Sequence, residues 1–173
     1  ILKFKYKKIK FFKLDFNKFD EKNISLELSN IFKQNFDAII NLVGYIDNKS
    51  FENYKINNII KSIKINALVP LYFYKIFIKK MIKNNKGRIV NCSSIGVKFG
   101  GGKTTFNYSL SKHTLEFLPN SYKDWAKHNV FINNLRLGVV RTKIHKRIKN
   151  KNISKRIKLI PVGRIAEKYE VID

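Results

Sequence analysis

The chain alternates short apolar runs with longer segments whose apolar residues recur at helical spacing. Residues 37–44 (DAIINLVG), 87–94 (GRIVNCSS) and 130–137 (VFINNLRL) are largely apolar runs of strand length. Such runs are typical of strands that are buried on both faces of a sheet. A β-prone run at residues 8–14 (KIKFFKL), followed by a polar turn, predicts one more strand.

The segments between these runs show the periodicity of amphipathic helices. Residues 24–35 predict a helix, residues 54–84 predict a long helix with a kink at Pro70, and residues 105–128 predict a third. The basic tail beyond residue 137 predicts short helical pieces, the last of them opened by PVGRIAEKYEVID at residues 161–173.

Strands that alternate with helices predict βαβ units around a parallel sheet with helices on both faces. We therefore expect an α/β fold, a doubly wound, Rossmann-like sheet in three layers, with residues 1–173 forming one partial domain. The chain starts at Ile1 and its only methionine is Met81, so we expect a fragment of a longer protein. Ligands of such sheets bind beyond the carboxyl ends of the strands.

The composition agrees with a folded domain but leaves the partner open. The chain has 173 residues, 44% of them hydrophobic, and 36 basic against 12 acidic residues give a formal charge of +24. Such a charge would suit nucleic acid or an anionic surface. Arginine occupies only six positions, however, and the lysines are mixed with Ile, Asn and Phe, which a base bias of the genome would produce. We expect no specific nucleic-acid partner, since no recognised motif is present.

Cysteine usage and hydropathy limit the kinds of site and the cellular location that we expect. The single cysteine, Cys92, excludes a disulfide framework or a cysteine-based metal site within this chain. No apolar run approaches the roughly 18 residues of a membrane span, and lysines interrupt the N-terminal segment too often for a signal peptide. We expect a cytoplasmic protein without a membrane partner.

The stretch NYSLSK holds the first candidate chemistry. Tyr108 and Lys112 are four residues apart, so they share one face of the predicted helix. A free phenol titrates near pH 10, but a cation ~4 Å away at an effective dielectric of ~20 favours the phenolate by ~4 kcal/mol, at most ~3 pKa units. The pair could therefore move a proton to or from an alcohol or carbonyl oxygen. Tyr and Lys at this spacing also occur by chance in many helices.

Two further polar residues could join the pair. Ser94 ends the strand before this helix, and its hydroxyl could hold the same reacting oxygen; strand-ending serines more often form turns. Asn66, in the long helix, could hold a backbone group or a water next to Lys112, or could simply be a tolerated polar residue near the kink.

These segments, taken in order, resemble the short-chain dehydrogenase/reductase family. NCSSIG followed by NYSLSK resembles its catalytic Ser and Tyr-x-x-x-Lys, and NLVG at 41–44 resembles its Asn-Asn-Ala-Gly strand end. Further segments also resemble the family: LDF at 14–16, Asn66 at the helical Asn position, RLGVVRT at 136–142 and IPVGRIAEKYEV at 160–171. The resemblance spans residues 8–172, and the order and spacing of the motifs are more specific than any one of them.

The resemblance implies an oxidoreductase that moves a hydride between a nicotinamide cofactor, NAD or NADP, and a carbonyl or alcohol substrate such as a 3-oxoacyl thioester or a sugar. It implies Tyr108 as general acid/base, Lys112 as the residue that binds the nicotinamide ribose and lowers the pKa of that phenol, Ser94 as the group that orients the substrate, and Asn66 in a proton relay. For the cofactor, the resemblance implies contacts from Asp15, Phe16, Asn41, Gly44, Tyr108, Lys112, Val140 and Thr142, and for the substrate from Ser94 and Tyr108.

The chain also departs from the family pattern. The family's Gly-rich N-terminal turn, which approaches the pyrophosphate, is absent, as is its final strand, so the expected sheet is incomplete at both ends. Leu137 replaces the usual Pro before Gly138, and Pro119 lies inside the predicted catalytic helix. The fragment itself could therefore be inactive. The charges that choose NAD or NADP follow a strand that this chain lacks, so the choice stays open.

Other functions are weighed against this one. GGGKTT at 100–105 resembles a P-loop, but five residues rather than four separate Gly96 from Gly102, so a flexible loop beside the substrate is the better interpretation. The three histidines are too scattered for a metal site. A truncated or degenerate relative could act as a non-catalytic binding or assembly module. The family resemblance also implies a homodimer or homotetramer.

Overall fold

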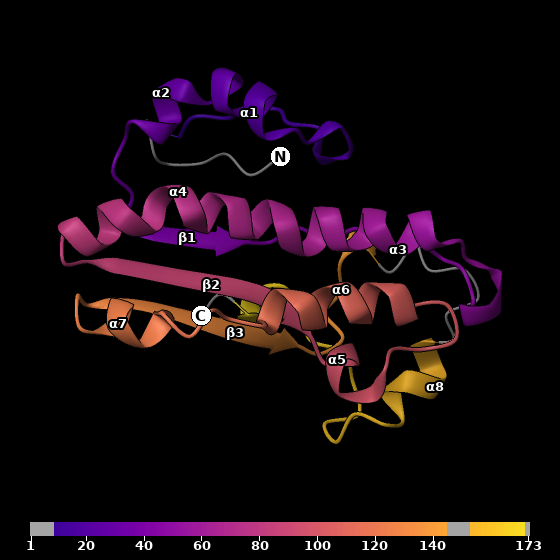
Figure 1. Cartoon of the computed structure of the whole chain (residues 1–173). Coiled ribbons are helices and arrows are strands. Elements are labelled where there is room, and N and C mark those ends of the chain that lie inside the picture. Colours follow the sequence, from indigo (N-terminus) through magenta and orange to yellow (C-terminus); the bar gives the residue numbers. More distant parts are fainter. Residues whose placement is uncertain (1–8, 145–152, 172–173) are drawn as a thin grey trace.

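Among the residues that the structure describes, three parallel strands form a sheet (Figure 1). The structure is a computed structural model, and it describes residues 9–144 and 153–171. Strand β2 (Gly87–Ser94) lies between β1 (Ala38–Asn41) and β3 (Val130–Leu137), with Ile40 opposite Val90 and Asn91 opposite Asn134. The predicted parallel α/β architecture is confirmed, and all three strands end at the same edge of the sheet.

The predicted strand at residues 8–14 is wrong for its described part. Residues 9–15 form no strand, and Phe11 and Phe12 are exposed. Within the described residues no neighbouring strand pairs with this segment, so its apolar side chains do not suffice to hold it extended in a sheet. A short 3₁₀ turn, η1 (Phe16–Lys18), follows.

The next predicted helix forms as two short ones. Helix α1 (Glu21–Glu27) begins at Asp20, whose carboxylate accepts hydrogen bonds from the backbone amides of Lys22 and Asn23, and α2 (Ser29–Phe32) continues after Leu28. Aromatic rings join this pair to the later helix α4 (Val69–Lys83), because Phe32 packs edge-to-face against three of its rings.

The long helix predicted at 54–84 is interrupted by a turn of π-helix. Helix α3 (Ile56–Ile63) runs into the π-helical η3 (Lys64–Leu68), which leads into α4 (Val69–Lys83). Pro70 lies at the start of α4, where its missing amide hydrogen interrupts the α-helical hydrogen-bond pattern. The π turn accommodates this interruption, because the amide of Val69 bonds to the carbonyl of Lys64 instead.

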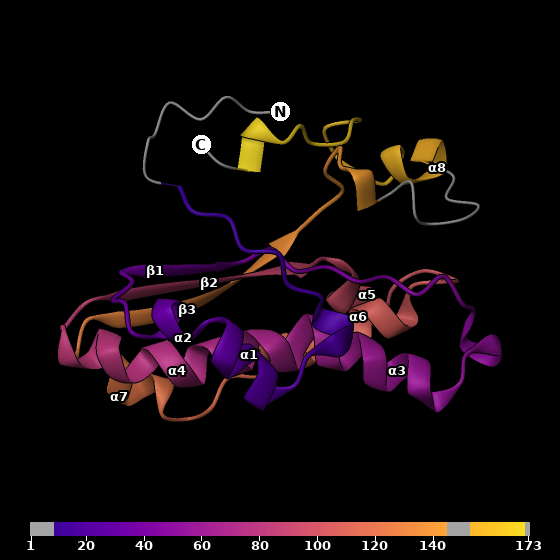
Figure 2. The ribbon, with the colours of Figure 1, turned by 90° about the horizontal axis from the view of Figure 1, so that it is seen from above.

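The core lies between the sheet and the long helix. Tyr74, Ile78 and Met81 of α4 pack against Ile89 and Val130 of the sheet, all of them buried. Figure 2 shows α3, α4, α6 and α7 on this side of the sheet and α8 on the opposite side. On that opposite face the strands carry exposed apolar side chains, among them Ile40, Phe131 and Leu135.

Pro119 divides the predicted helix 105–128. After β2 come a short helix, α5 (Gly96–Phe99), and then α6 (Phe106–Glu116) and α7 (Tyr122–Ala126). Proline has no amide hydrogen and crowds the preceding turn, so the chain leaves the helix before it and starts again after it. The prediction of one continuous helix is therefore wrong, although both pieces lie within the predicted range.

The described residues of the tail, 138–144 and 153–171, fold mainly as turns. They contain α8 (Ile153–Ile157) and a 3₁₀ turn, η5 (Tyr169–Val171), and another 3₁₀ turn, η2 (Phe51–Asn53), precedes α3. Within residues 161–171, the part of its range that the structure describes, the helix predicted from residue 161 forms only as η5. The backbone of Ala166 instead bonds to the carbonyl of Val139 and the amide of Arg141, which holds it extended. Among the described residues, no helix is long and apolar enough to cross a membrane.

Gly87 is a glycine at which an added methyl group should cost stability, because it packs directly against core side chains. A Cβ there would lie 2.7 Å from Sδ of Met81 and 2.9 Å from Cγ1 of Val130, inside the core. We expect Gly87→Ala to lower the free energy of unfolding by about 1–3 kcal/mol through overpacking, measured by urea titration. The matched control is Gly138→Ala, where no atom lies within 4 Å, and a similar loss there would contradict the prediction.

Candidate active site

A cavity of about 1020 Å³ lies outside the carboxyl ends of the strands and is bounded by the ends of β1 and β2, the start of α6 and the tail. Three of the four predicted catalytic residues line it: Ser94, Tyr108 and Lys112. The predicted cofactor residues that line it besides Tyr108 and Lys112 are Gly44, Val140 and Thr142. Segments far apart in the sequence therefore meet at this edge of the sheet.

Lys112 is held by two backbone carbonyl oxygens, one in β2 and one in the segment that follows β1. Its Nζ donates to the oxygen of Val43 at 2.7 Å and to the oxygen of Cys92 at 2.6 Å, and the residue is only 2% exposed. Burial disfavours the charged form and lowers the pKa of Lys112 to about 8. The amine is thus oriented by the sheet and still opens into the cavity.

Tyr108 lies one helical turn before Lys112, whose Nζ is 5.9 Å from the centre of the phenol ring. Burial, and to a smaller extent Cys92, raises the pKa of Tyr108 to about 12. The structure thus differs from the expectation that the ammonium lowers this pKa. The physical reason is that the phenol is desolvated, while the ammonium is bonded to carbonyl oxygens rather than to the phenol.

Ser94 ends β2 and combines both interpretations of a serine at this position. Its Oγ accepts a hydrogen bond from the amide of Gly96 at 3.1 Å, which is the turn-forming role. The same side chain is half-buried and lines the cavity together with Tyr108 and Lys112. The hydroxyl hydrogen can still be donated to another group.

Asn66 lies on the π turn and outside the cavity lining. Its Oδ1 accepts from the amide of Tyr45 at 2.7 Å, and its Nδ2 donates to the carbonyl of Tyr45 and to Oγ of Ser111, each at 2.8 Å. Ser111 in turn donates to the carbonyl of Tyr108 at 2.7 Å. The fully buried amide therefore ties the segment after β1 to the helix that carries Tyr108 and Lys112.

Asn41, a predicted cofactor contact, is buried elsewhere. It starts a row of amides that crosses the sheet on its helix side: Asn41 donates to Asn91 at 2.9 Å, and Asn91 donates to Asn134 at 2.8 Å. Asn41 also donates to the hydroxyl of Tyr74, and Asn134 to the carbonyl of Glu116. The row links all three strands to α4 and α6, and Asn41 and Asn91 directly precede Leu42 and Cys92, which line the cavity.

Glu116 braces the end of α6 against the two longer strands. Its carboxylate accepts two hydrogen bonds from Nε and one from Nη2 of Arg136, at 2.6 to 3.0 Å, and another from Ser93 at 2.5 Å. Burial opposes ionisation, but the hydrogen bonds of Arg136 and Ser93 hold the pKa of Glu116 below its ordinary value. Ser93 adjoins Ser94, so this brace fixes the strand end beside the cavity.

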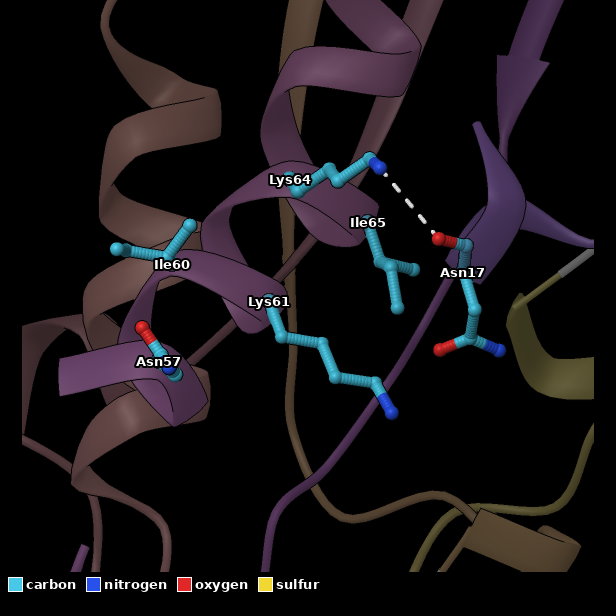
Figure 3. A pocket seen from close by; sticks show the side chains of 6 residues that line it. All are labelled: Asn17, Asn57, Ile60, Lys61, Lys64 and Ile65. Carbon is cyan, nitrogen blue, oxygen red and sulfur yellow. Dashed lines mark hydrogen bonds between the residues drawn. The ribbon is translucent and has the colours of Figure 1, made fainter. Parts of the chain in front are cut away.

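Asp15 and Phe16, predicted to contact adenine, do not line the cavity. Asp15 caps η1 by accepting from the amide and side chain of Asn17. Asn17 lines a separate depression of about 330 Å³ against α3, where Nζ of Lys64 donates to its carbonyl at 3.4 Å (Figure 3). The two predicted residues are therefore placed beside this depression.

The Gly-rich loop uses its amides internally. The amide of Gly101 bonds to the carbonyl of Gly96, and the amide of Gly102 bonds to Oγ1 of Thr105. A Cβ on Gly101, which has a φ of +84°, would lie 2.6 Å from the carbonyl oxygen of Thr105. The glycines thus let the loop pack closely on the start of α6, which counts against a phosphate cradle.

Several cavity residues were not predicted from the sequence. Cys92 lines the cavity beside Lys112, and burial raises the pKa of its thiol. The tail contributes an apolar and partly basic wall, which comprises Ile144, Arg156, Leu159, Ile160, Pro161, Val162, Arg164, Ala166 and Glu170. The apolar residues after residue 158 could have indicated that the tail lines a cavity. The many lysines around them made this pattern hard to recognise.

Comparisons with known proteins show the family to which the chain is related. The family model described as short chain dehydrogenase matches residues 2–153. The chain is 27% identical over 154 residues to the 3-oxoacyl-[acyl-carrier-protein] reductase FabG of Buchnera aphidicola subsp. Acyrthosiphon pisum, covering 87% of the chain and 63% of that protein. It is 30% identical over 141 residues to the NADH-dependent L-xylulose reductase of Ambrosiozyma monospora, covering 78% of the chain and 52% of that protein.

Solved structures share the fold. The structure of ElxO with NADP bound superposes with a TM-score of 0.77 at 23% identity, over 94% of this chain and 67% of that one. A protein of Agrobacterium tumefaciens described as a gluconate dehydrogenase superposes with a TM-score of 0.79 at 20% identity, over 92% of this chain and 64% of that one. The chain thus spans between half and two thirds of the length of the curated relatives named above.

The burial of Lys112 predicts how stability depends on pH. Its folded pKa of about 8 lies below the ordinary 10.5, so between these values the unfolded chain holds the proton that the folded chain has lost. Stability from this group therefore rises with pH across that window and is constant outside it. The free energy of unfolding of the wild type minus that of Lys112→Met should grow by up to about 3 kcal/mol from pH 8 to 10.5.

Urea titrations at several pH values provide the measurement. Lys123→Met is the matched control, because Lys123 is exposed on α7, and its profile should run parallel to that of the wild type. A difference between the wild type and Lys112→Met that stays flat across the window would show that the amine is not desolvated in solution.

Proposed function

The chain belongs to the short chain dehydrogenase family, and on that premise we propose that its protein transfers a hydride between NAD or NADP and a carbonyl or alcohol substrate, with Tyr108 as general acid/base. The observation that carries the proposal is that Ser94, Tyr108 and Lys112, from β2 and α6, line one cavity at the carboxyl edge of the sheet. Ligands bind at this edge in open α/β folds.

The residues fit the nicotinamide end of such a cofactor. At about 1020 Å³ the cavity is large enough for an extended ligand, and its lining is mostly apolar with few polar groups, as is usual for cofactor sites. Lys112 can donate to ribose hydroxyls, and Gly44 leaves the wall open where a Cβ would approach Ile144 to 3.2 Å. Val140 and Thr142 would contact the carboxamide and pyrophosphate side.

The chain's own residues would move and hold the proton. The bound cofactor supplies the hydride, and the protein supplies a proton for the substrate oxygen. Because burial raises the pKa of Tyr108 to about 12, its hydroxyl keeps its proton at neutral pH and can donate it. Among the described residues, no hydrogen bond to that hydroxyl is present, so it can turn toward a substrate oxygen, which Ser94 would also hold.

Lys112 would stabilise the phenolate of Tyr108 that forms when the proton is transferred. Once Tyr108 has given up its proton, the phenolate is buried, and a nearby cation lowers its energy. Lys112 is held in place by the carbonyl oxygens of Val43 and Cys92, so little reorganisation is needed when the negative charge appears. Asn66 is bonded to Tyr45, after β1, and to Ser111 of α6. These bonds support a role for Asn66 in positioning α6, which carries Tyr108 and Lys112.

The substrate class is proposed from the relatives' names. One relative named above is a 3-oxoacyl-[acyl-carrier-protein] reductase and the other is an L-xylulose reductase. A 3-oxoacyl thioester or a sugar-like carbonyl compound would therefore be suitable first substrates. We further propose a cytoplasmic homodimer or homotetramer as the working form.

Tyr108→Phe tests the proposed acid. The substitution removes one oxygen and no packing surface, so we expect turnover to fall by about 10²–10⁴-fold with little change in stability. The assay is oxidation of NADH and NADPH by the protein that carries this chain, across ketones, sugars and 3-oxoacyl thioesters. Tyr122→Phe, which removes the same oxygen from an exposed tyrosine on α7, is the matched control.

Equal rates for the wild type and Tyr108→Phe would remove the proposed acid/base. Binding of NADH and NADPH, followed by their fluorescence, separates this result from a loss of the cofactor site. Cofactor binding without turnover on any substrate would favour the alternative of a non-catalytic relative.

A further inference from the structure

Arg156 lies at the cavity wall opposite the strand ends. It belongs to α8, is half-buried and lines the same cavity as Tyr108. Its Nη2 lies 2.9 Å from the position that a Cβ on Gly102 would take, so the guanidinium rests against the loop between β2 and α6. This loop follows Ser94, one of the proposed catalytic residues, and its Gly101 lines the same cavity.

The charges of the cavity leave Arg156 uncompensated. The other ionisable lining residues besides Tyr108 and Cys92 are Lys112, Arg164 and Glu170. Glu170 accepts two hydrogen bonds from Arg164, at 2.7 and 2.8 Å, which hold the pKa of this carboxyl at about 2. Lys112 is bonded to two carbonyl oxygens. Within residues 9–144 and 153–171, no carboxylate lies within ion-pair distance of Arg156.

The surroundings of Arg156 favour the binding of an anion. The neighbouring tail contributes Leu159, Ile160 and Val162 to the cavity, so the wall around the guanidinium is largely apolar. A guanidinium in partly desolvated surroundings gains most from an anion that can accept two parallel hydrogen bonds. Carboxylates and phosphates have this geometry.

From these observations we propose that Arg156 binds an anionic group of the substrate, a carboxylate or a phosphate, that is separated from the reacting carbonyl by an apolar stem. The inference rests on the proposed function, because it places the carbonyl at Tyr108 and Ser94. It adds a selection for charged over neutral carbonyl compounds, exerted by one residue of the tail.

Matched pairs of substrates test this selection. The pairs are straight-chain oxo acids against their methyl esters, and dihydroxyacetone phosphate against dihydroxyacetone. Arg156→Gln should lower kcat/KM for the preferred anionic member by about 10- to 100-fold and leave its neutral partner within about threefold. Lys158→Gln removes one positive charge from an exposed residue of the same segment and is the matched control. The two kinds of pair distinguish a carboxylate from a phosphate.

Three results would overturn the assignment. One is a wild type without preference for any anionic member, and another is an equal ratio of anionic to neutral kcat/KM in Arg156→Gln and Lys158→Gln. The third is loss of NADH and NADPH binding in Arg156→Gln, which would assign the residue to the cofactor's phosphates. Thermal unfolding of each variant shows whether it folds.

Calorimetric binding of the anionic compounds separates this inference from the proposed function. Binding that depends on Arg156, with no turnover of any carbonyl compound, would support the anion site while the proposed function fails. Turnover of neutral ketones that depends on Tyr108, with no effect of Arg156→Gln on anion binding, would keep the proposed function and overturn this inference.

Discussion

The burial of one ammonium group organises the site. Lys112 can be buried only because two carbonyl oxygens, from Val43 after β1 and from Cys92 in β2, accept its hydrogen bonds. These oxygens come together because parallel strands end at one edge of the sheet. The helix that carries Lys112 is therefore tied to the strand ends, and Tyr108, one turn earlier, takes its place in the cavity as a consequence.

Three amides, two of them buried, and one ion pair also hold this arrangement together. The row formed by Asn41, Asn91 and Asn134 joins the three strands side chain to side chain, and Glu116 joins α6 to Arg136 of β3. Each of these side chains is hydrogen-bonded, so the row is polar and its members are paired. Such a row favours one register of the strands, since a shift by one residue would turn every side chain to the other face.

Much of the fold could be predicted from the sequence, because its strands are short apolar runs. The predicted ranges of β2 and β3 agree with the structure, and β1 lies within its range. The segment at 8–14 misled the prediction because strand formation needs a partner, which a local pattern does not specify. Pro119 could have been taken as a helix end, since the cost of a proline inside a helix exceeds the gain from the apolar spacing around it.

For the site, the sequence was informative about which residues meet and uninformative about their energetics. The motif order predicted that Ser94, Tyr108 and Lys112 lie together, and they line one cavity. The direction of the pKa shift of Tyr108 depends on burial, which the spacing of two residues cannot supply. The wall formed by Arg156 and its neighbours depends on where a tail of irregular structure folds back, and no periodicity encodes that path.

The π turn at Lys64–Leu68 fixes the rotational phase of the long helix. An α-helix turns by about 100° per residue, so one inserted residue rotates everything before it by that angle relative to everything after it. The residues of α3 and α4 that face the protein therefore do not follow one continuous α-helical periodicity. Without the inserted residue, Asn66 would point in another direction around the helix axis and would lose its contact with Tyr45, so the π turn sets the angular alignment on which that contact depends.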